Sequence, residues 1–152
     1  MTIAELRTAY RSDEEWTGQI IATAKSGTFS AQGAAWFDRT HVKRTFLASL
    51  RCFPLTSASP PTIEGGFGGQ EKEGSLDQCH LRIIIKPYNA RGTLLVHVDL
   101  ASEFWKTPDL DLQNRATIRF LTEYAAVEGF AEQFEEVLDG KREEAVLKGA
   151  TN

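Results

Sequence analysis

The chain has 152 residues, the length of one ordinary domain that can bury a hydrophobic core. Hydrophobic residues make up 41% and charged residues 25% of it, as in soluble globular proteins, and no apolar run approaches the roughly 20 residues of a membrane span. The start MTIAELRTAYRSDEEW lacks the apolar stretch of a secretory signal, and two cysteines, Cys52 and Cys79, make a poor disulfide framework. We therefore expect a cytoplasmic protein with reduced thiols.

The formal net charge of −4 is unevenly distributed. Residues 123–144 hold eight acids against Lys141 and Arg142, a net charge of −6, so the other 130 residues sum to +2. A nucleic-acid-binding protein would show a clustered positive face instead, and we expect no nucleic-acid partner. An acidic face suits a basic protein partner, although a solvated helix surface is the commoner explanation of such a run.

The N-terminal half predicts strands followed by a helix. Residues 1–10 favour a leading helix over a leading strand, because apolar side chains recur at helical spacing. Residues 16–25 and 28–37 are predicted to be two strands joined by a tight turn. Asp38 can then cap a helix. The apolar stripe of that helix consists of Val42, Phe46, Leu47 and Leu50.

The glycine-rich stretch 60–74 holds five of the chain's twelve glycines. A P-loop needs Lys and then Ser or Thr after its last glycine, and a dinucleotide fingerprint needs a third glycine where Glu71 stands. The stretch satisfies neither pattern, and its acids would repel a phosphate. We interpret residues 56–76 as a connection or mobile loop between an N-terminal half (1–55) and a C-terminal half (77–152) of a single domain.

The C-terminal half repeats the plan. Strands are predicted at 81–86 and 93–100, joined by a hairpin loop, and at 116–121. Thr122 is predicted to cap the following helix. The tail at 143–147 is open between helix and strand. The apolar stripe of the helix consists of Val127, Phe130, Phe134, Val137 and Leu138, and Asp139-Gly140 supplies its end.

These elements predict an α+β fold, with an antiparallel sheet and two main helices packed on one face. Placing Phe37-Asp38 over Leu121-Thr122 aligns the apolar stripes of the two helices. The alignment either reflects an internal duplication, which would make the chain a ββα pseudo-repeat, or the common requirements of any strand-to-helix unit. The acids of the second helix lie largely off its apolar stripe, so this helix presents a negative face.

Metal and catalytic chemistry find little support in the sequence. Cys52, Cys79 and His80 lack the paired spacing of zinc ligands, and neighbours on a strand point to opposite faces. His97 and Asp99 share a strand face two residues apart, and an imidazole beside a carboxylate is the usual general base. No Ser or Cys stands in a recognisable nucleophile motif. We interpret the pair as polar strand surface, and expect no catalytic residue, metal or cofactor.

Two groups of aromatic residues differ in their setting. Trp16, Trp36 and Phe37 flank the first hairpin and are predicted to lie in the core or at its edge. Phe104 and Trp105 lie in a polar loop, where they either pack back on the sheet edge or stay exposed, as is common at binding surfaces. The candidate partner-binding residues are therefore Phe104, Trp105, Glu128, Glu132, Glu135 and Glu136.

Four segments together carry a family resemblance: the hairpin end at 33–38 with its helix, the turn at 63–66, the hairpin at 81–100 and the helix at 124–140. In layout they resemble small cytosolic immunity proteins encoded beside bacterial polymorphic and contact-dependent toxins. The resemblance lies in core and turn residues. It implies a protein without catalytic residues that binds a cognate toxin domain and blocks its active site or its access to substrate. Many such toxins are basic nucleases, which suits the acidic helix.

We therefore expect a non-catalytic interaction protein, an immunity protein with a basic toxin domain as partner and with no membrane partner. The first alternative is a small-ligand or regulatory binding domain, with a deep cavity between sheet and helices lined by Trp36 and Trp105. The second is an enzyme built on His97 and Asp99, which requires a third polar group converging on that pair. The sequence does not indicate an oligomeric state.

Overall fold

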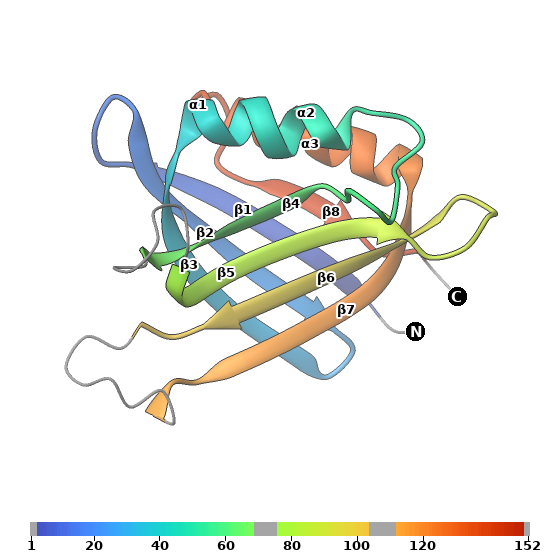
Figure 1. The fold of residues 1–152 in the computed structure, drawn as a ribbon, viewed down its shortest axis with the longest axis horizontal. Coiled ribbons are helices and arrows are strands. Elements are labelled where there is room, and N and C mark those ends of the chain that lie inside the picture. The colour runs from blue at the N-terminus through green and yellow to red at the C-terminus, as the bar shows by residue number, and fades with distance from the viewer. Residues whose placement is uncertain (1–2, 69–75, 104–111, 151–152) are drawn as a thin grey trace.

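A computed structural model of the chain describes residues 3–68, 76–103 and 112–150. It confirms the α+β class and the antiparallel pairing, with eight strands divided between two four-stranded sheets (Figure 1). The first sheet has the order β3-β2-β1-β8 and comprises β1 (Ala4–Ser12), β2 (Thr17–Ser26), β3 (Phe29–Asp38) and β8 (Ala145–Lys148). The second has the order β4-β5-β6-β7 and comprises β4 (Thr62–Gly68), β5 (Leu76–Pro87), β6 (Thr93–Ala101) and β7 (Arg115–Glu123).

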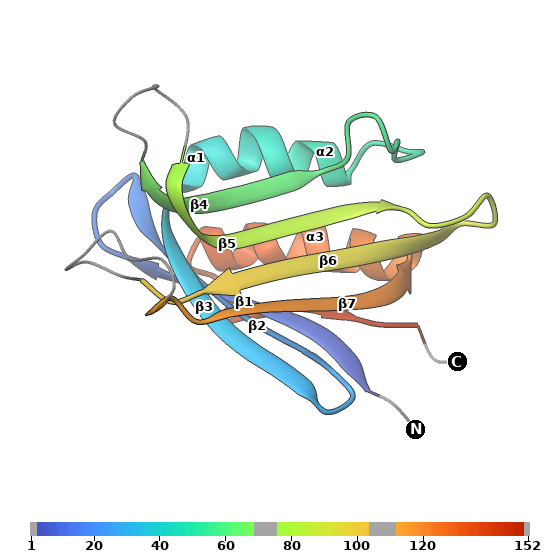
Figure 2. The ribbon, with the colours of Figure 1, turned by 60° about the horizontal axis from the view of Figure 1, so that its bottom comes forward.

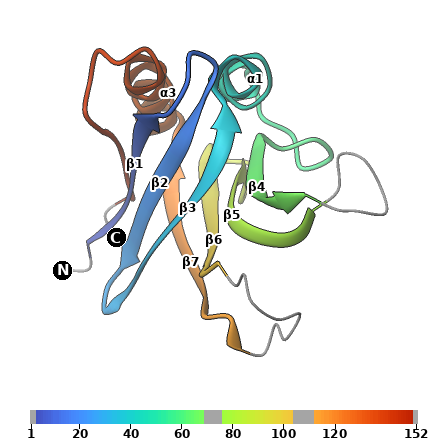
Figure 3. The ribbon, with the colours of Figure 1, turned by 90° about the vertical axis from the view of Figure 1, so that its left-hand side faces the viewer.

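The two sheets face each other, and their strands cross in projection (Figures 1 and 3). Alternate residues of each strand point into the space between them, which is the period-two pattern of half-buried strands. Gly65 of β4 marks a close approach, because a Cβ there would come within 2.5 Å of the Phe37 ring on β3. β2 and β6 are inner strands of the two sheets, and their inward hydrophobic residues are all buried: Ile20, Ala22, Ala24, Leu94, Val96, Val98 and Leu100.

Two helical segments lie along the same side of the paired sheets (Figures 1 and 2). The first runs through α1 (Arg39–Val42), the π-helical η1 (Lys43–Leu47) and α2 (Ala48–Leu50). Asp38 caps it as predicted, since its carboxylate accepts from the backbone amides of Thr40 and His41 at 2.8 and 3.2 Å. The second, α3 (Tyr124–Leu138), packs against β8, β1 and β7 and touches the first helix.

The apolar stripe predicted for α3 is confirmed, because all five of its residues are buried. The two helical segments meet through the aromatic rings of Phe46 and Phe134, whose centroids are 6.2 Å apart; within α3 the centroids of Phe130 and Phe134 are 5.5 Å apart. Gly140 follows the helix with a φ of +76°, a left-handed conformation that glycine adopts without steric cost. The stop predicted at Asp139-Gly140 is therefore confirmed as well.

Two local predictions are wrong. Residues 4–12 form β1 instead of a helix. The sequence did not show the alternation of a strand, because one of the inward positions holds the polar residue Thr8. Thr122 does not cap α3. It is the last inward residue of β7, buried, and its hydroxyl donates to the carbonyl of Lys148 at 2.9 Å. The N-cap position belongs to Glu123, whose side chain makes no capping hydrogen bond.

The connection predicted at 56–76 contains a strand. β4 pairs with β5 over most of its length, with irregular register on both sides of Gly66-Phe67. Glycines conceal this strand in the sequence because they carry no side chain to show alternation, while they permit the bulges and the close approach to β3. Residues 69–75 of the stretch lie outside the described part. At the other end, the undecided tail forms β8, which joins the sheet of the N-terminal half.

The expected burial of two tryptophans is also wrong. Trp16 is 57% exposed and Trp36 is 52% exposed, whereas Phe37 packs partly buried against the core as predicted. Ala35 and Phe37 point inward along β3, so the residue between them must point outward. Among the helices of the described residues, none is long and apolar enough to cross a membrane.

Candidate functional site

One face of α3 carries a stripe of polar residues beside its buried stripe. Tyr124, Glu128, Glu132 and Glu135 follow one another at spacings of four, four and three residues, which places them along one side of a helix. Glu128 and Glu132 are exposed, while Tyr124 and Glu135 are partly buried. The burial of Val127, Phe130 and Phe134 fixes the direction in which this stripe points.

The stripe forms one wall of a groove of about 490 Å³, and the end of the first helical segment forms the other. Phe53 is 78% exposed and packs edge-on against the Tyr124 ring, with centroids 4.8 Å apart at an interplanar angle of 68°. The Tyr124 hydroxyl accepts a hydrogen bond from the Leu55 amide at 3.1 Å, which ties the two walls together. We call this site the acidic groove; its lining is Leu50, Arg51, Cys52, Phe53, Tyr124, Glu128, Glu132 and Glu135.

The charges in the acidic groove are only partly neutralised. Arg51 forms an ion pair with Glu135 at 2.7 Å across the groove. Glu128 and Glu132 form no ion pair or hydrogen bond with another residue of the described chain. Three carboxylates therefore face one guanidinium, and two of them keep their full capacity to accept hydrogen bonds from a partner.

The structure brings together three of the six predicted partner-binding residues. Glu128, Glu132 and Glu135 line the groove, whereas Glu136 turns toward the end of α3 and accepts from Arg142 Nε at 3.4 Å. Phe104 and Trp105 lie outside the described residues.

Phe53 and Tyr124 are the groove residues that sequence reasoning missed. A signal for Tyr124 was present, because it precedes Glu128 by four residues and so shares its helix face. No comparable signal existed for Phe53, because the pairing of its loop with α3 depends on how the two helices pack.

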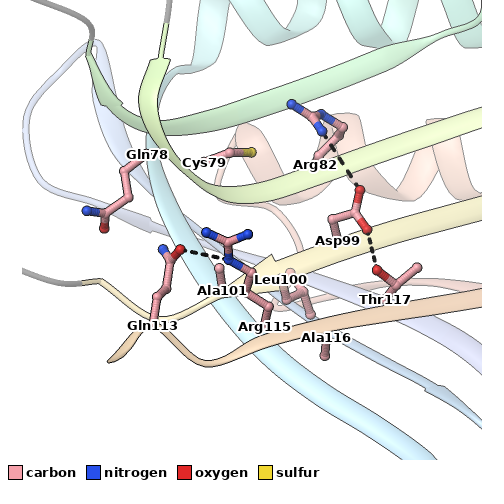
Figure 4. Close-up of a pocket in the computed structure, with 10 residues that line it drawn as sticks. All are labelled: Gln78, Cys79, Arg82, Asp99, Leu100, Ala101, Gln113, Arg115, Ala116 and Thr117. Carbon is pink, nitrogen blue, oxygen red and sulfur yellow. Dashed lines mark hydrogen bonds and ion pairs between the residues drawn. The ribbon is translucent and has the colours of Figure 1, made fainter. Parts of the chain in front are cut away.

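A cluster of polar side chains lies on the outer face of the second sheet. His97 Nε2 is 3.0 Å from Asp99 Oδ1, as the shared strand face predicted, and the Thr117 hydroxyl donates to the same oxygen at 2.7 Å. Arg82 donates to Glu64 at 2.9 Å, and its Nη1 lies 3.9 Å from Asp99 Oδ2 (Figure 4). We call Glu64, Arg82, His97, Asp99 and Thr117 the polar cluster.

The polar cluster stabilises its own ionised carboxylate. Partial burial opposes ionisation of Asp99, but the hydrogen bonds from Thr117 and His97 and the charge of Arg82 outweigh it and lower the pKa of Asp99 below its ordinary value. A pocket of about 340 Å³ adjoins these residues and includes Cys79 and Arg115 (Figure 4). Arg82, Asp99 and Thr117 line this pocket, and their hydrogen-bonding positions that are not used within the cluster can bind a polar group there.

No activated nucleophile is evident among the described residues of this pocket. Burial raises the pKa of the Cys79 thiol, which keeps it protonated and poorly reactive, and its sulfur contacts the Leu81 carbonyl at 3.6 Å. The Thr117 hydroxyl donates a hydrogen bond to Asp99, which also contacts His97, so the hydroxyl is not hydrogen-bonded to the imidazole that would have to activate it. Thr117 and Arg82 therefore both converge on Asp99, and among the described residues only Asp99 is hydrogen-bonded to the His97 imidazole.

Trp36 does not line a cavity between sheet and helices, as the small-ligand alternative requires, because it points outward from β3. Trp105, the other residue of that expectation, lies outside the described residues.

Comparison with protein-family models, with curated proteins and with solved structures found no match to this chain.

Proposed function

We propose that this protein is a non-catalytic interaction module, an immunity protein that neutralises a basic toxin domain by binding it at the acidic groove. The observation that carries the proposal is the pair of unneutralised carboxylates, Glu128 and Glu132, beside the exposed ring of Phe53. The family resemblance of the sequence points to the same role.

Each part of the groove suits a different component of protein recognition. Exposed carboxylates accelerate encounter with a cationic partner and discriminate against acidic proteins, and their effect weakens as salt is added. Aromatic side chains such as Phe53 and Tyr124 supply contact area at low cost in conformational entropy, and they also attract cationic side chains to their faces. A lysine or arginine of the toxin domain would meet both kinds of group in one groove.

The polar cluster supports a non-catalytic role over an enzymatic one. Its charged and hydrogen-bonding groups are largely engaged with each other, and burial raises the pKa of the neighbouring Cys79 thiol. These mutual contacts are sufficient to explain why polar residues occupy this part of the sheet surface, without a catalytic role.

The test is a comparison of three baits in lysate of the source cell: the wild-type chain, Glu128→Gln/Glu132→Gln, and Glu14→Gln/Glu15→Gln. The last variant removes the same charge from an exposed turn between β1 and β2. We expect a basic protein to bind the wild type and the control, to be lost from the groove variant, and to elute at moderate salt. The captured protein should be toxic when expressed alone, and co-expression of the wild-type chain should restore growth.

Two results would overturn the proposal. Equal capture of the same protein by all three baits would exclude the acidic groove as the binding site. Capture of a protein whose expression is harmless would exclude the immunity role, even if the groove were confirmed as the site of contact.

A further inference from the structure

Strand β3 is an edge strand without protection. It ends the first sheet and pairs only with β2, in an uninterrupted register of ten residue pairs. The pair Ser26–Phe29 closes the two-residue turn and is hydrogen-bonded. Along the two antiparallel strands, hydrogen-bonded pairs then alternate with non-hydrogen-bonded pairs, so every second residue of β3 points its N–H and C=O groups away from β2. These residues are Ser30, Gln32, Ala34 and Trp36. In the described part of the chain no strand other than β2 pairs with them, and Figure 3 shows β3 at the margin of its sheet.

The other three edges each carry a feature that discourages pairing with another chain. β8 has only four residues and ends in Lys148. β4 is short and interrupted by two register irregularities. β7 carries Arg115 and Arg119, and the Ala150 amide already donates to its Leu121 carbonyl at 2.7 Å. Short length, bulges and charged side chains are the usual protections of an edge, because each obstructs the approach of a second strand.

β3 has none of these features. It is ten residues long, contains no proline, lysine or arginine, and carries its single charge at Asp38, the last residue. Its outer face is apolar in part, since Ala34 lies beside Ile21 of β2, and Trp36 is 52% exposed. An exposed, regular and uncharged edge is a template for one more antiparallel strand.

We propose that β3 pairs with β3 of a second copy of this chain, forming a two-fold dimer with a continuous eight-stranded sheet. Two identical strands can satisfy each other's edge groups in antiparallel orientation, as an isologous interface requires. No like charges meet along Phe29–Phe37 because this segment is uncharged. The one charge of the strand, Asp38, lies at its last residue and caps the following helix, so it does not oppose the pairing.

The proposal does not depend on the acidic groove. The groove is formed by α3 and the end of the first helical segment, and β3 contributes no residue to its lining. A dimer of this kind presents two acidic grooves, and its formation can be measured on the purified chain alone.

Analytical ultracentrifugation over a range of concentrations tests the proposal with the wild type and three variants. Gln32→Pro removes an edge amide that makes no bond to β2, and Gln32→Lys places a positive charge in the middle of the edge of each copy. Thr23→Lys is the matched control, because Thr23 pairs with Gln32 on the same face but lies on β2, away from the edge. Thermal unfolding of each variant identifies any that fail to fold.

We expect the wild type and Thr23→Lys to shift from the mass of one chain to that of two as concentration rises, and folded Gln32 variants to stay at one. If Gln32→Pro does not fold, Gln32→Lys decides alone. A wild type that remains monomeric up to millimolar concentration overturns the proposal. Dimerisation that persists in both Gln32 variants, or that Thr23→Lys also abolishes, overturns pairing through the edge of β3.

Discussion

The acidic groove and the polar cluster both gather ionisable side chains at the surface, yet they differ in how those charges are compensated. In the polar cluster Asp99 accepts from His97 and Thr117, and Arg82 is held by Glu64. In the groove Arg51 compensates Glu135, while Glu128 and Glu132 face solvent without a described partner. Charges that satisfy each other contribute to the stability of the chain that holds them. Charges left unpaired contribute little to it and remain available to another molecule.

The largest expected effect comes from removing the support of the groove. Phe134→Ala empties a fully buried site that contacts both Phe46 and Phe130, so the free energy of unfolding should fall by about 3–5 kcal/mol. Chemical denaturation followed by circular dichroism measures the loss. Phe53→Ala is the control, because that ring is largely exposed and its removal should cost far less. A loss below about 1 kcal/mol for Phe134→Ala would contradict the packing of α3 described above.

Removing a carboxylate from the polar cluster should lower the free energy of unfolding, whereas removing carboxylates from the acidic groove should not. Asp99→Ala leaves Thr117 and His97 without their shared acceptor and Arg82 without one of its two carboxylate neighbours, and because the site is partly exposed we expect a loss of about 1–2 kcal/mol. The native-state pKa of Asp99 lies below its ordinary value of 3.8, so its contribution is present above that pH and is lost as the pH falls through the native value.

Urea unfolding of the wild type and Asp99→Ala at neutral and acid pH measures both parts of this prediction. The difference in unfolding free energy between the two proteins should shrink as the pH falls below 3.8. Thr117→Val, which removes one donor and leaves the carboxylate, should lose less stability than Asp99→Ala. An equal loss for all variants at every pH would show that the ionised carboxylate is not what the cluster stabilises.

His80 lies on β5, the strand that also carries Arg82, and it is a buried titratable group outside both the groove and the polar cluster. It is 1% exposed, packs edge-on against Phe67 with centroids 4.5 Å apart, and burial lowers its pKa below the ordinary value of 6.5. The unfolded chain then binds more protons near and below that pH, so the stability of the native state should fall as the solution is acidified. Replacing His80 with Gln should flatten the pH dependence of the melting temperature between neutrality and pH 5. An unchanged slope would assign it to other groups.

The sequence predicted elements whose signal lies in side-chain periodicity. The stripe through Phe130 and Phe134 and the cap at Asp38 are local, and both are confirmed. β1 and β4 escaped prediction because inward Thr8 and the glycines around Gly65 conceal alternation, and because strands acquire their stability from partners that are distant in the chain. The same limit applies to the sites. His97 and Asp99 were recognisable as a pair on one strand, whereas the contact of Phe53 with Tyr124 depends on the packing of two helices.

The smallest expected change in stability belongs to the groove itself. Glu128 and Glu132 are like charges four residues apart on one helix, an arrangement that slightly destabilises a helix. Glu128→Gln/Glu132→Gln should therefore leave the free energy of unfolding unchanged or raise it, within about 0.5 kcal/mol. Urea unfolding of this variant and of Asp99→Ala compares the two losses of stability, and Glu14→Gln/Glu15→Gln controls for the change in net charge. A clear loss of stability in the groove variant would mean that these carboxylates support the native fold through contacts of their own. The groove and the polar cluster would then be alike, and the principal argument for a partner at α3 would fail.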